Sequence, residues 1–294
     1  MIGIVQDKRS FSDPQSFLHL AYELGANHVE FKYEERLAQS YNLRGDVTDR
    51  LRQFAERCKM TVSVHAPYDN DLSFGSPDAD KQTKIRLQML ECLEFAERIG
   101  ACYITVHGGS MEVSPSYDVK ADLGKPNRIT LRDKVSRDIL ASLRERTLED
   151  LAWFIACCQS KGVVVALENY HDFSFFKLRY PIYPADFEEC YRTLGNVFSM
   201  NFDSGHAHST GIHIVDFINQ IGVDRIAGTH LHDNHEVKDE HLPIFEGTID
   251  FRSFFQSYHA EGWQFPLNIE VKEAQALLRG WRSLQEQVAA YAAK

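Results

Sequence analysis

Residues 163–168 read VVVALE, a run of five apolar residues that ends in a glutamate. Two earlier stretches have a similar form and end in a histidine: TVSVH at residues 61–65 and YITVH at residues 103–107. Val, Ile, Thr and Tyr are enriched in β-strands, and short runs of this kind are typical of strands buried in a parallel sheet. Each stretch is therefore predicted to be a strand that carries an ionisable residue at its carboxyl end.

Eight such runs occur along the chain and alternate with amphipathic segments. They cover residues 2–5, 28–31, 61–65, 103–107, 163–168, 197–203, 225–232 and 265–271. This alternation predicts a parallel sheet of βα units, and eight units without a Gly-rich phosphate loop favour a closed barrel over an open sheet. A barrel of this type typically has about 250 residues, which suits a chain of 294. The expected fold class is α/β, a (β/α)8 TIM barrel in a single domain over residues 1–294.

The segments between the runs have helical periodicity. Before Gly100, apolar residues recur at steps of three and four, at Ile85, Met89, Cys92, Ala96 and Ile99. The last segment repeats them at Leu277, Trp281, Leu284, Val288 and Tyr291. Because this spacing places apolar side chains on one face, both segments are predicted to be amphipathic helices, the first ending at its glycine.

Two stretches interrupt the regular alternation. Residues 108–134, after the fourth run, mix Gly, Ser, Pro and charged residues, and residues 169–184, after the fifth, are rich in aromatic residues. Loops that follow strand carboxyl ends line the mouth of a barrel, so both are candidate lids over a substrate. The alternative is that they are surface insertions without contact to a ligand.

Composition excludes several classes of function. The net charge of −10 argues against broad adhesion to nucleic acid, which depends on clustered Lys and Arg. No stretch approaches the roughly 20 apolar residues of a membrane span, so no membrane partner is expected. The first residues lack the pattern of a secretory signal, which indicates a cytoplasmic location. None of the six cysteines forms a C-x-x-C pair, and we expect no disulfides.

Nine residues of metal-ligand type lie at or soon after the ends of the predicted strands. They are His65, His107, Glu168, Asp203, His206, His230, Asp239, His241 and Glu270. A single histidine at a strand end is more often a hydrogen-bonded structural residue than a ligand, and a nearby aspartate can simply orient its partner. Six such strand ends together indicate a metal site. Burying carboxylates and imidazoles at one mouth is destabilising, and a divalent cation offsets this cost.

The ligand types restrict the metal. Mixed oxygen and nitrogen ligands favour Zn, Mn, Co or Fe over Ca, and the absence of cysteine ligands removes the strongest indication of a structural zinc site. The spacing of Asp203 from His206, and of Asp239 from His241, suits one shared metal or two adjacent metals. The expected cofactor is therefore a divalent metal, with one to three ions.

The motifs resemble those of the xylose-isomerase-like TIM barrels, a superfamily of sugar isomerases, keto-sugar epimerases, inosose dehydratases and endonuclease IV-type nucleases. In chain order they are VEF at 29–31, HAPY at 65–68, HGG at 107–109, LEN at 167–169, FDSGHAH at 202–208, HLHDN at 230–234, DEHLPIFEGTIDF at 239–251 and IEVK at 269–272. Together and in this order they are specific for the superfamily but much less specific for the reaction.

The resemblance to the epimerases implies a set of roles. Glu168, Asp203, His230 and Glu270 would hold one metal, and Glu168 and Glu270 would also exchange the substrate proton next to a carbonyl that the metal polarises. The positions expected to contact substrate are Glu30, His206, His232 and Lys272. The expected activity is isomerisation or epimerisation of a sugar, sugar phosphate or polyol, with dehydration of similar substrates as a close variant. The superfamily also makes a homo-oligomer a possibility.

The resemblance to endonuclease IV offers a second reading, an apurinic-site nuclease or phosphoesterase with three zinc ions. One ion would be held by His65, His107 and Glu168, a second by the four epimerase ligands, and a third by His206, Asp239 and His241. The opening MIGIVQDK departs from the G-x-H-x-S start of those nucleases, and the acidic charge adds no support. A third reading, a barrel that binds a small ligand without turnover, does not explain so many ionisable groups.

Overall fold

Eight parallel strands form one sheet, whose order is β11-β10-β8-β4-β3-β2-β1-β12. The structure, a computed structural model, describes residues 1–7, 9–33, 46–68, 73–112, 119–122, 125–131, 134–172 and 177–292. The strands are β1 (Ile2–Val5), β2 (His28–Lys32), β3 (Thr61–His65), β4 (Tyr103–Val106), β8 (Val164–Glu168), β10 (Ser199–Asp203), β11 (Ile226–His230) and β12 (Leu267–Ile269). Each predicted run overlaps one of them, with its ends displaced by at most two residues.

The last strand nearly closes the sheet into a ring. β12 pairs in parallel with β1, and a single bridge just beyond β11 joins Leu231 to Ile269. Two backbone hydrogen bonds accompany that bridge: the Leu231 N–H donates to Asn268 O at 2.7 Å, and the Glu270 N–H donates to Leu231 O at 3.2 Å. The expected (β/α)8 TIM barrel is therefore confirmed.

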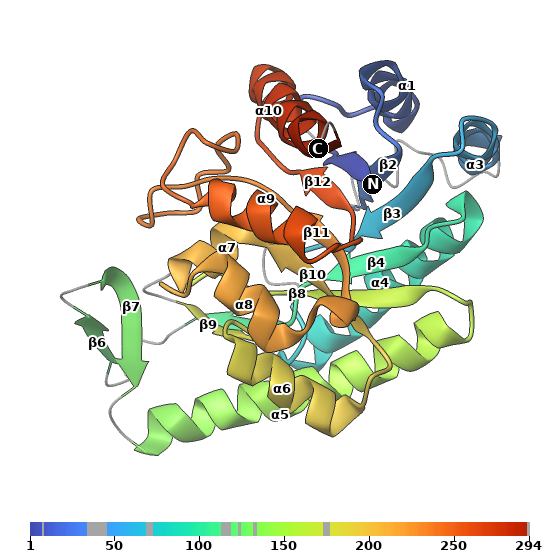
Figure 1. Cartoon of the computed structure of the whole chain (residues 1–294). Coiled ribbons are helices and arrows are strands. Elements are labelled where there is room, and N and C mark those ends of the chain that lie inside the picture. Colours follow the sequence, from blue (N-terminus) through green and yellow to red (C-terminus); the bar gives the residue numbers. More distant parts are fainter. Residues whose placement is uncertain are drawn as a thin grey trace.

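Helices surround the strands on the outside of the barrel (Figure 1). They are α1 (Pro14–Leu24), α3 (Asp46–Arg57), α4 (Ala79–Ile99), α5 (Lys134–Gln159), α6 (Pro184–Leu194), α7 (Ser204–Ser209), α8 (Ile214–Ile221), α9 (Phe251–Ala260) and α10 (Ala274–Ala292), with a 3-10 turn at Val223–Arg225. Helix α4 ends as predicted, because Gly100 follows it with φ of 73°, a left-handed conformation that glycine adopts without a steric cost. The described helices include none with the length and apolar character needed to cross a bilayer.

The two faces of the barrel strands have different chemistry. On β2, Val29 and Phe31 belong to the apolar core that the helices cover, whereas His28 and Glu30 are buried among polar groups of the barrel interior. The ring of His28 contacts Ser63 Oγ at 3.0 Å and Tyr103 Oη at 3.2 Å. Because side chains alternate along a strand, this period of two directs every second residue of β2 toward the barrel axis. The interior is thus lined with groups that can support a polar site at the strand ends.

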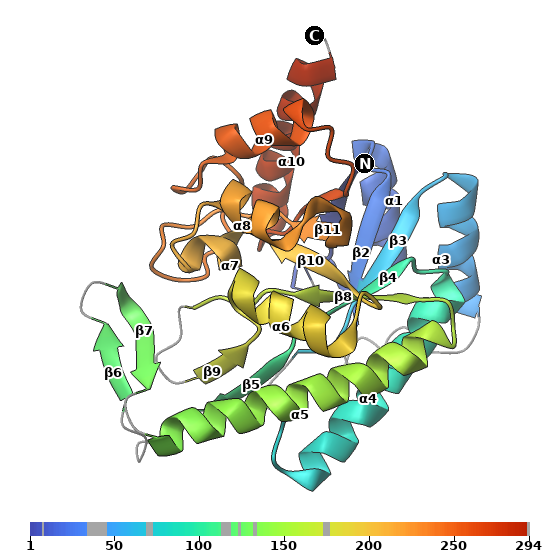
Figure 2. The same ribbon diagram turned by 60° about the horizontal axis from the view of Figure 1, so that its bottom comes forward.

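The two irregular stretches contain short strands that the sequence did not predict. β5 (Gly109–Glu112) and β9 (Lys177–Tyr180), one from each stretch, pair in antiparallel fashion and form the ribbon β5–β9. β6 (Val119–Asp122) pairs with β7 (Lys125–Leu131) in a hairpin that stands away from the barrel beyond the start of α5 (Figures 1 and 2). Residues 113–118, 123–124, 132–133 and 173–176 of these stretches lie outside the described residues.

Candidate metal centre

The structure brings the nine predicted metal ligands together at one end of the barrel. Six lie at the ends of six different strands, His65, His107, Glu168, Asp203, His230 and Glu270. His206 lies in α7, and Asp239 and His241 lie in the segment after β11. Seven of the nine line a pocket of about 550 Å³, and the other two, Asp203 and His230, are fully buried. The expectation that strand ends would gather these side chains therefore agrees with their positions in the fold.

Four of these residues converge on one nitrogen atom. His230 Nδ1 lies 3.2 Å from Glu168 Oε1, 3.2 Å from Glu270 Oε2 and 3.9 Å from Asp203 Oδ2. These four are the residues that the resemblance to epimerases assigned to one metal. Three carboxylates around one imidazole nitrogen, all in a dry environment, form a donor set that suits a divalent cation.

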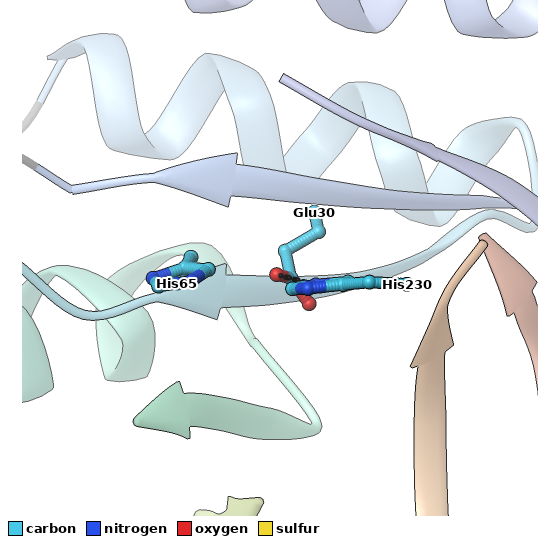
Figure 3. Close-up of side chains that lie close together, drawn as sticks. All are labelled: Glu30, His65 and His230. Atoms are coloured by element: carbon cyan, nitrogen blue, oxygen red, sulfur yellow. Dashed lines mark hydrogen bonds and ion pairs between the residues drawn. The ribbon is translucent and has the colours of Figure 1, made fainter. Parts of the chain in front are cut away.

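Glu30 holds the other side of the His230 ring. Its Oε1 lies 2.7 Å from His230 Nε2, and its Oε2 accepts hydrogen bonds from Ser63 Oγ at 2.9 Å and Thr105 Oγ1 at 3.0 Å. Figure 3 shows Glu30 reaching from β2 toward this ring, with His65 beyond it. A carboxylate that binds the second nitrogen of a ligand histidine fixes its tautomer and orientation. Glu30 is fully buried and does not line the pocket, so this geometry favours a positioning role over contact with substrate.

Glu168 also gathers a second group of ligands. Its Oε2 lies 2.9 Å from His107 Nε2 and 3.2 Å from His65 Nε2. His65 Nδ1 lies 2.8 Å from the carbonyl oxygen of Ala66, which can only accept a hydrogen bond, so Nδ1 carries the hydrogen. In the neutral ring, Nε2 then presents a lone pair to a carboxylate oxygen. A cation or a proton between the two atoms removes this repulsion.

A third group lies around Asp239. Its Oδ2 is 2.8 Å from His241 Nε2 and 3.9 Å from His206 Nε2. His206 Nδ1 lies 2.7 Å from the carbonyl oxygen of Asn169, so Nε2 is the nitrogen left to bind a metal. Asp239 Oδ1 is buried and has no hydrogen-bond partner among the described residues. A buried carboxylate oxygen without a partner is destabilising, and a bound cation would satisfy it.

Asp203 is held from two sides. Its carboxylate accepts a hydrogen bond from the backbone N–H of His206 at 2.7 Å and lies 3.0 Å from His232 Nε2. A Cβ atom on Gly205 would lie 2.0 Å from His232 Cε1, so glycine is required for this ring to reach Asp203. His232 is fully buried and does not line the pocket. As with Glu30, the contacts of His232 favour a role in orienting a proposed metal ligand, here Asp203, over contact with substrate.

Charges in the site are strongly coupled. Burial alone would raise the pKa of Glu168, but the neighbouring His107 and His230 lower it well below its usual value. Burial would likewise raise the pKa of Glu270, but His230 and Lys32 lower it well below its usual value. The pKa of His230 is in turn raised well above its ordinary value, because the surrounding glutamates outweigh the effect of burial. Without metal, a proton on His230 therefore balances part of the carboxylate charge around it.

Two residues that line the pocket, Lys32 and His171, were not predicted from the sequence. Lys32 Nζ lies 2.5 Å from Glu270 Oε1, and His171 lies within 4.8 Å of His206 and Asp239 when their ligand atoms are compared. Burial alone would lower the pKa of Lys32, but Glu270 raises it well above its usual value. The signal for Lys32 was present, because it lies two residues after Glu30 on the same strand and hence on the same face. No comparable signal marked His171, which lies in an irregular segment.

The donor set fits a divalent metal. The described residues offer several groups of three ligand atoms that lie within 4.8 Å of one another, among them His65, His107 and Glu168, and His232, His241 and Glu270. The fixed tautomers of His65 and His206, together with the unsatisfied oxygen of Asp239, also favour a metal site. Oxygen and nitrogen donors without sulfur are those that Zn, Mn, Co and Fe accept.

A ring of eight βα units with ionisable side chains at its strand ends defines a class of α/β barrels. The family described as xylose isomerase-like TIM barrel matches residues 18–291, and the chain belongs to this family. This confirms the resemblance found in the motifs.

Three proteins similar to this chain are between 14% and 27% identical to it. An uncharacterized protein of Sinorhizobium fredii is 27% identical over 279 residues, which cover 86% of this chain and 79% of the relative. A solved structure described as a D-tagatose 3-epimerase-like protein has a TM-score of 0.74 at 21% identity, covering 99% of this chain and 98% of the other. The structure of the IOLI protein with a zinc atom has a TM-score of 0.73 at 14% identity, and 99% of each chain is covered. At these identities the structural likeness establishes the fold.

Proposed function

We propose that this protein is a divalent-metal-dependent isomerase or epimerase of a sugar, sugar phosphate or polyol, acting by proton transfer next to a carbonyl group. The observation that carries the proposal is the convergence of Glu168, Glu270 and Asp203 on His230 Nδ1 at the floor of the pocket. The names of the structural neighbours, which include a D-tagatose 3-epimerase-like protein, support the same class of reaction.

Glu168, Asp203, His230 and Glu270 would hold the metal. When bound, a divalent cation supplies Lewis-acid polarisation of a substrate carbonyl. Glu168 and Glu270 are the groups that would remove and return the proton on the adjacent carbon. Their lowered pKa values keep both carboxylates ionised at neutral pH, as a proton acceptor requires.

Other residues of the pocket would orient these two carboxylates and the substrate. Lys32 contacts Glu270 Oε1, while Oε2 of the same carboxylate faces His230, so each oxygen has its own partner. His206 and Lys272 line the pocket and would donate to substrate oxygens. Lys272 Nζ already lies 3.4 Å from the carbonyl oxygen of Asp239, which places it close to the third ligand group.

Proton exchange in heavy water tests the proposal. Purified protein loaded with Mn, Co or Zn is incubated with a panel of ketoses, ketose phosphates and keto-polyols in deuterated buffer, and products are examined by mass spectrometry and NMR. Deuterium at the carbon next to the carbonyl is expected for at least one compound, and EDTA should abolish its incorporation. Absence of deuterium across the whole panel with every metal would exclude the proposed reaction.

A phosphoesterase with three metals is the second candidate, and one observation favours it. Glu168 Oε2 faces both His65 and His107, so the site offers a second metal position beside the first. Such a cluster could activate a hydroxide for phosphoester hydrolysis. About three zinc ions per chain, together with EDTA-sensitive cleavage of a duplex containing an abasic site, would support this candidate. One ion per chain and no cleavage would remove it.

A further inference from the structure

The rim of the pocket is basic although the protein as a whole is acidic. Among the described residues, and apart from the proposed ligands and Lys32, the charged side chains that line it are the cationic Arg9, Lys81, Lys177, Arg179 and Lys272 and the acidic Asp7 and Glu112. The whole chain has a net charge of −10. A concentration of positive charge at the entrance of a concave site attracts anions, because low-dielectric walls focus the local field.

Arg179 differs from the other cations of the rim. Its side chain is half-buried, and its guanidinium lies over the ring of Tyr170, 5.6 Å from the centroid. Among the described residues no carboxylate lies within 4 Å of it, whereas Lys32 is paired with Glu270. Burial lowers the pKa of Arg179, although an arginine so placed remains charged at neutral pH. A guanidinium that is partly withdrawn from water and has no carboxylate within ion-pair distance is stabilised when a ligand supplies the counter-charge.

The ribbon β5–β9 fixes the position of this guanidinium. Arg179 pairs with Ser110 in the register of the ribbon, and Ser110 is itself anchored by a 2.6 Å hydrogen bond from Ser73 Oγ to its carbonyl oxygen. The Tyr170 ring beneath Arg179 lies 4.8 Å from the ring of His107, counted between centroids. The Tyr170 ring thus contacts Arg179 and also His107, one of the proposed metal ligands, and both Tyr170 and Arg179 line the pocket.

We propose that Arg179 binds an anionic group of the substrate, a phosphate ester or a carboxylate, at the end of the molecule away from the reacting carbonyl. The proposal rests on the proposed function, since it names the class of sugar that enters the site. Arginine presents several N–H donors in a planar fork that matches two oxygens of a phosphate or carboxylate, which lysine does not. The substrate is then a sugar phosphate or a sugar acid rather than a neutral sugar.

Binding measurements with a matched set of ligands test this inference. Calorimetry on the metal-loaded protein compares D-fructose, D-fructose 6-phosphate and D-fructuronate, which differ only at the terminal carbon, together with inorganic phosphate. We expect one of the two anionic sugars to bind at least about 10-fold more tightly than D-fructose. The preferred anion identifies the group, phosphate or carboxylate.

Variants of Arg179 separate its role from that of the metal site. Arg179→Gln should weaken binding of the preferred anionic sugar roughly 10- to 100-fold, as expected for hydrogen bonds to a charged group, and leave D-fructose unchanged. Arg179→Lys keeps the charge without the planar fork and should show an intermediate loss. Arg192→Gln, an exposed arginine of α6 outside the pocket, is the control and should have no effect.

The outcomes distinguish this inference from the proposed function. Loss of anion binding in Arg179→Gln supports the anion site even if no sugar undergoes proton exchange. Equal affinity of the wild type and Arg179→Gln for both anionic sugars and inorganic phosphate overturns it, as does the failure of the wild type to bind any of these anions. In either case deuterium exchange with a neutral ketose would still support the isomerase.

Discussion

Glu168 is the most connected carboxylate of the proposed site. One of its oxygens contacts His65 and His107, and the other lies 3.2 Å from His230, so it joins two of the ligand groups. Glu270 is connected differently, with Lys32 on one oxygen and His230 on the other. These contacts hold both carboxylates in place, and a fixed orientation is what a proton-transfer residue needs.

Neutral replacements at these two positions should abolish most of the turnover. Glu168→Gln and Glu270→Gln preserve shape but remove the proton acceptor and one negative metal ligand, so we expect kcat to fall by about 100-fold or more. Steady-state kinetics on the substrate identified by deuterium exchange measures the effect. Glu286→Gln, on the exposed face of α10, is the matched control. A near-normal rate in either glutamine variant would show that the assigned role is wrong.

Metal binding should release protons. Without metal, nearby carboxylates raise the pKa of His206 to about 10 despite burial, and that of His230 well above its ordinary value. Both rings are therefore protonated near pH 7, but His230, the histidine among the four proposed ligands, can bind a metal only as the neutral imidazole. The affinity for Mn or Zn should thus increase from about pH 6 to about pH 8, and titration calorimetry in buffers of different ionisation enthalpy should detect the released protons. Constant affinity without proton release would contradict the charge assignment.

For individual residues, the sequence predicted which side chains would gather at the mouth of the barrel better than it predicted the partners that each side chain contacts. The convergence of the six proposed ligands at strand ends could be predicted because the carboxyl ends of parallel strands point to one mouth of a barrel. Glu30 and His232 were expected at the substrate, but full burial gives them partners below the pocket. Lys32 was missed although it shares the face of Glu30. Arg179 could not be found, because its place in the pocket depends on how two distant segments pair.

The elements of the barrel followed from local patterns, whereas the ribbon β5–β9 did not. Barrel strands are runs of β-branched residues bounded by helices, so each is recognisable on its own. Residues 109–112 and 177–180 have no such pattern, and they pair across a long sequence separation. Their position is set by packing: a Cβ on Gly109 would lie 2.0 Å from Thr147 Oγ1 of α5, and Leu178 packs with Leu143 of the same helix. Tertiary contacts of this kind override local propensity.

A substitution at Gly108 should displace the ribbon without unfolding the barrel. A Cβ there would lie 2.1 Å from the carbonyl oxygen of Tyr180, a backbone atom that cannot move alone. We expect Gly108→Ala to lower kcat/KM by about 10- to 100-fold, because residues on the ribbon lose their alignment with the pocket. Hydrogen exchange should show less protection of the amides in β5 and β9.

The control for this prediction is a glycine remote from the mouth. Gly162 has φ of 70°, and a Cβ added to it would meet no atom of the described residues within 4 Å, so Gly162→Ala introduces backbone strain without a clash. It should lose about 1 kcal/mol of stability and keep its kcat/KM. If Gly108→Ala behaved in the same way, the ribbon would have no part in substrate binding.

For the whole molecule, closure of the ring depends on contacts between the first and last elements. Trp281 of α10 is 1% exposed, and its Nε1 donates a 3.0 Å hydrogen bond to Leu24 O at the end of α1. Trp281→Ala should therefore lower the free energy of unfolding by about 3–5 kcal/mol, measured by urea denaturation. Gln285 donates to the same oxygen from an exposed position, and Gln285→Ala should cost less than about 1 kcal/mol. If both variants lowered the free energy of unfolding by the same amount, burial of the Trp281 ring would not be the contact that stabilises the closed ring.

The position of Glu270 directly after the closing strand has a consequence for biosynthesis. The other proposed ligands precede Glu270 in the chain and emerge from the ribosome earlier, whereas the barrel folds as one unit. The full ligand set nevertheless exists only once β12 has been inserted beside β1. If the proposed metal is bound, a newly made chain would therefore complete its binding site only after most of the scaffold has been synthesised, so a shortage of metal should leave folded apoprotein rather than unfolded chains.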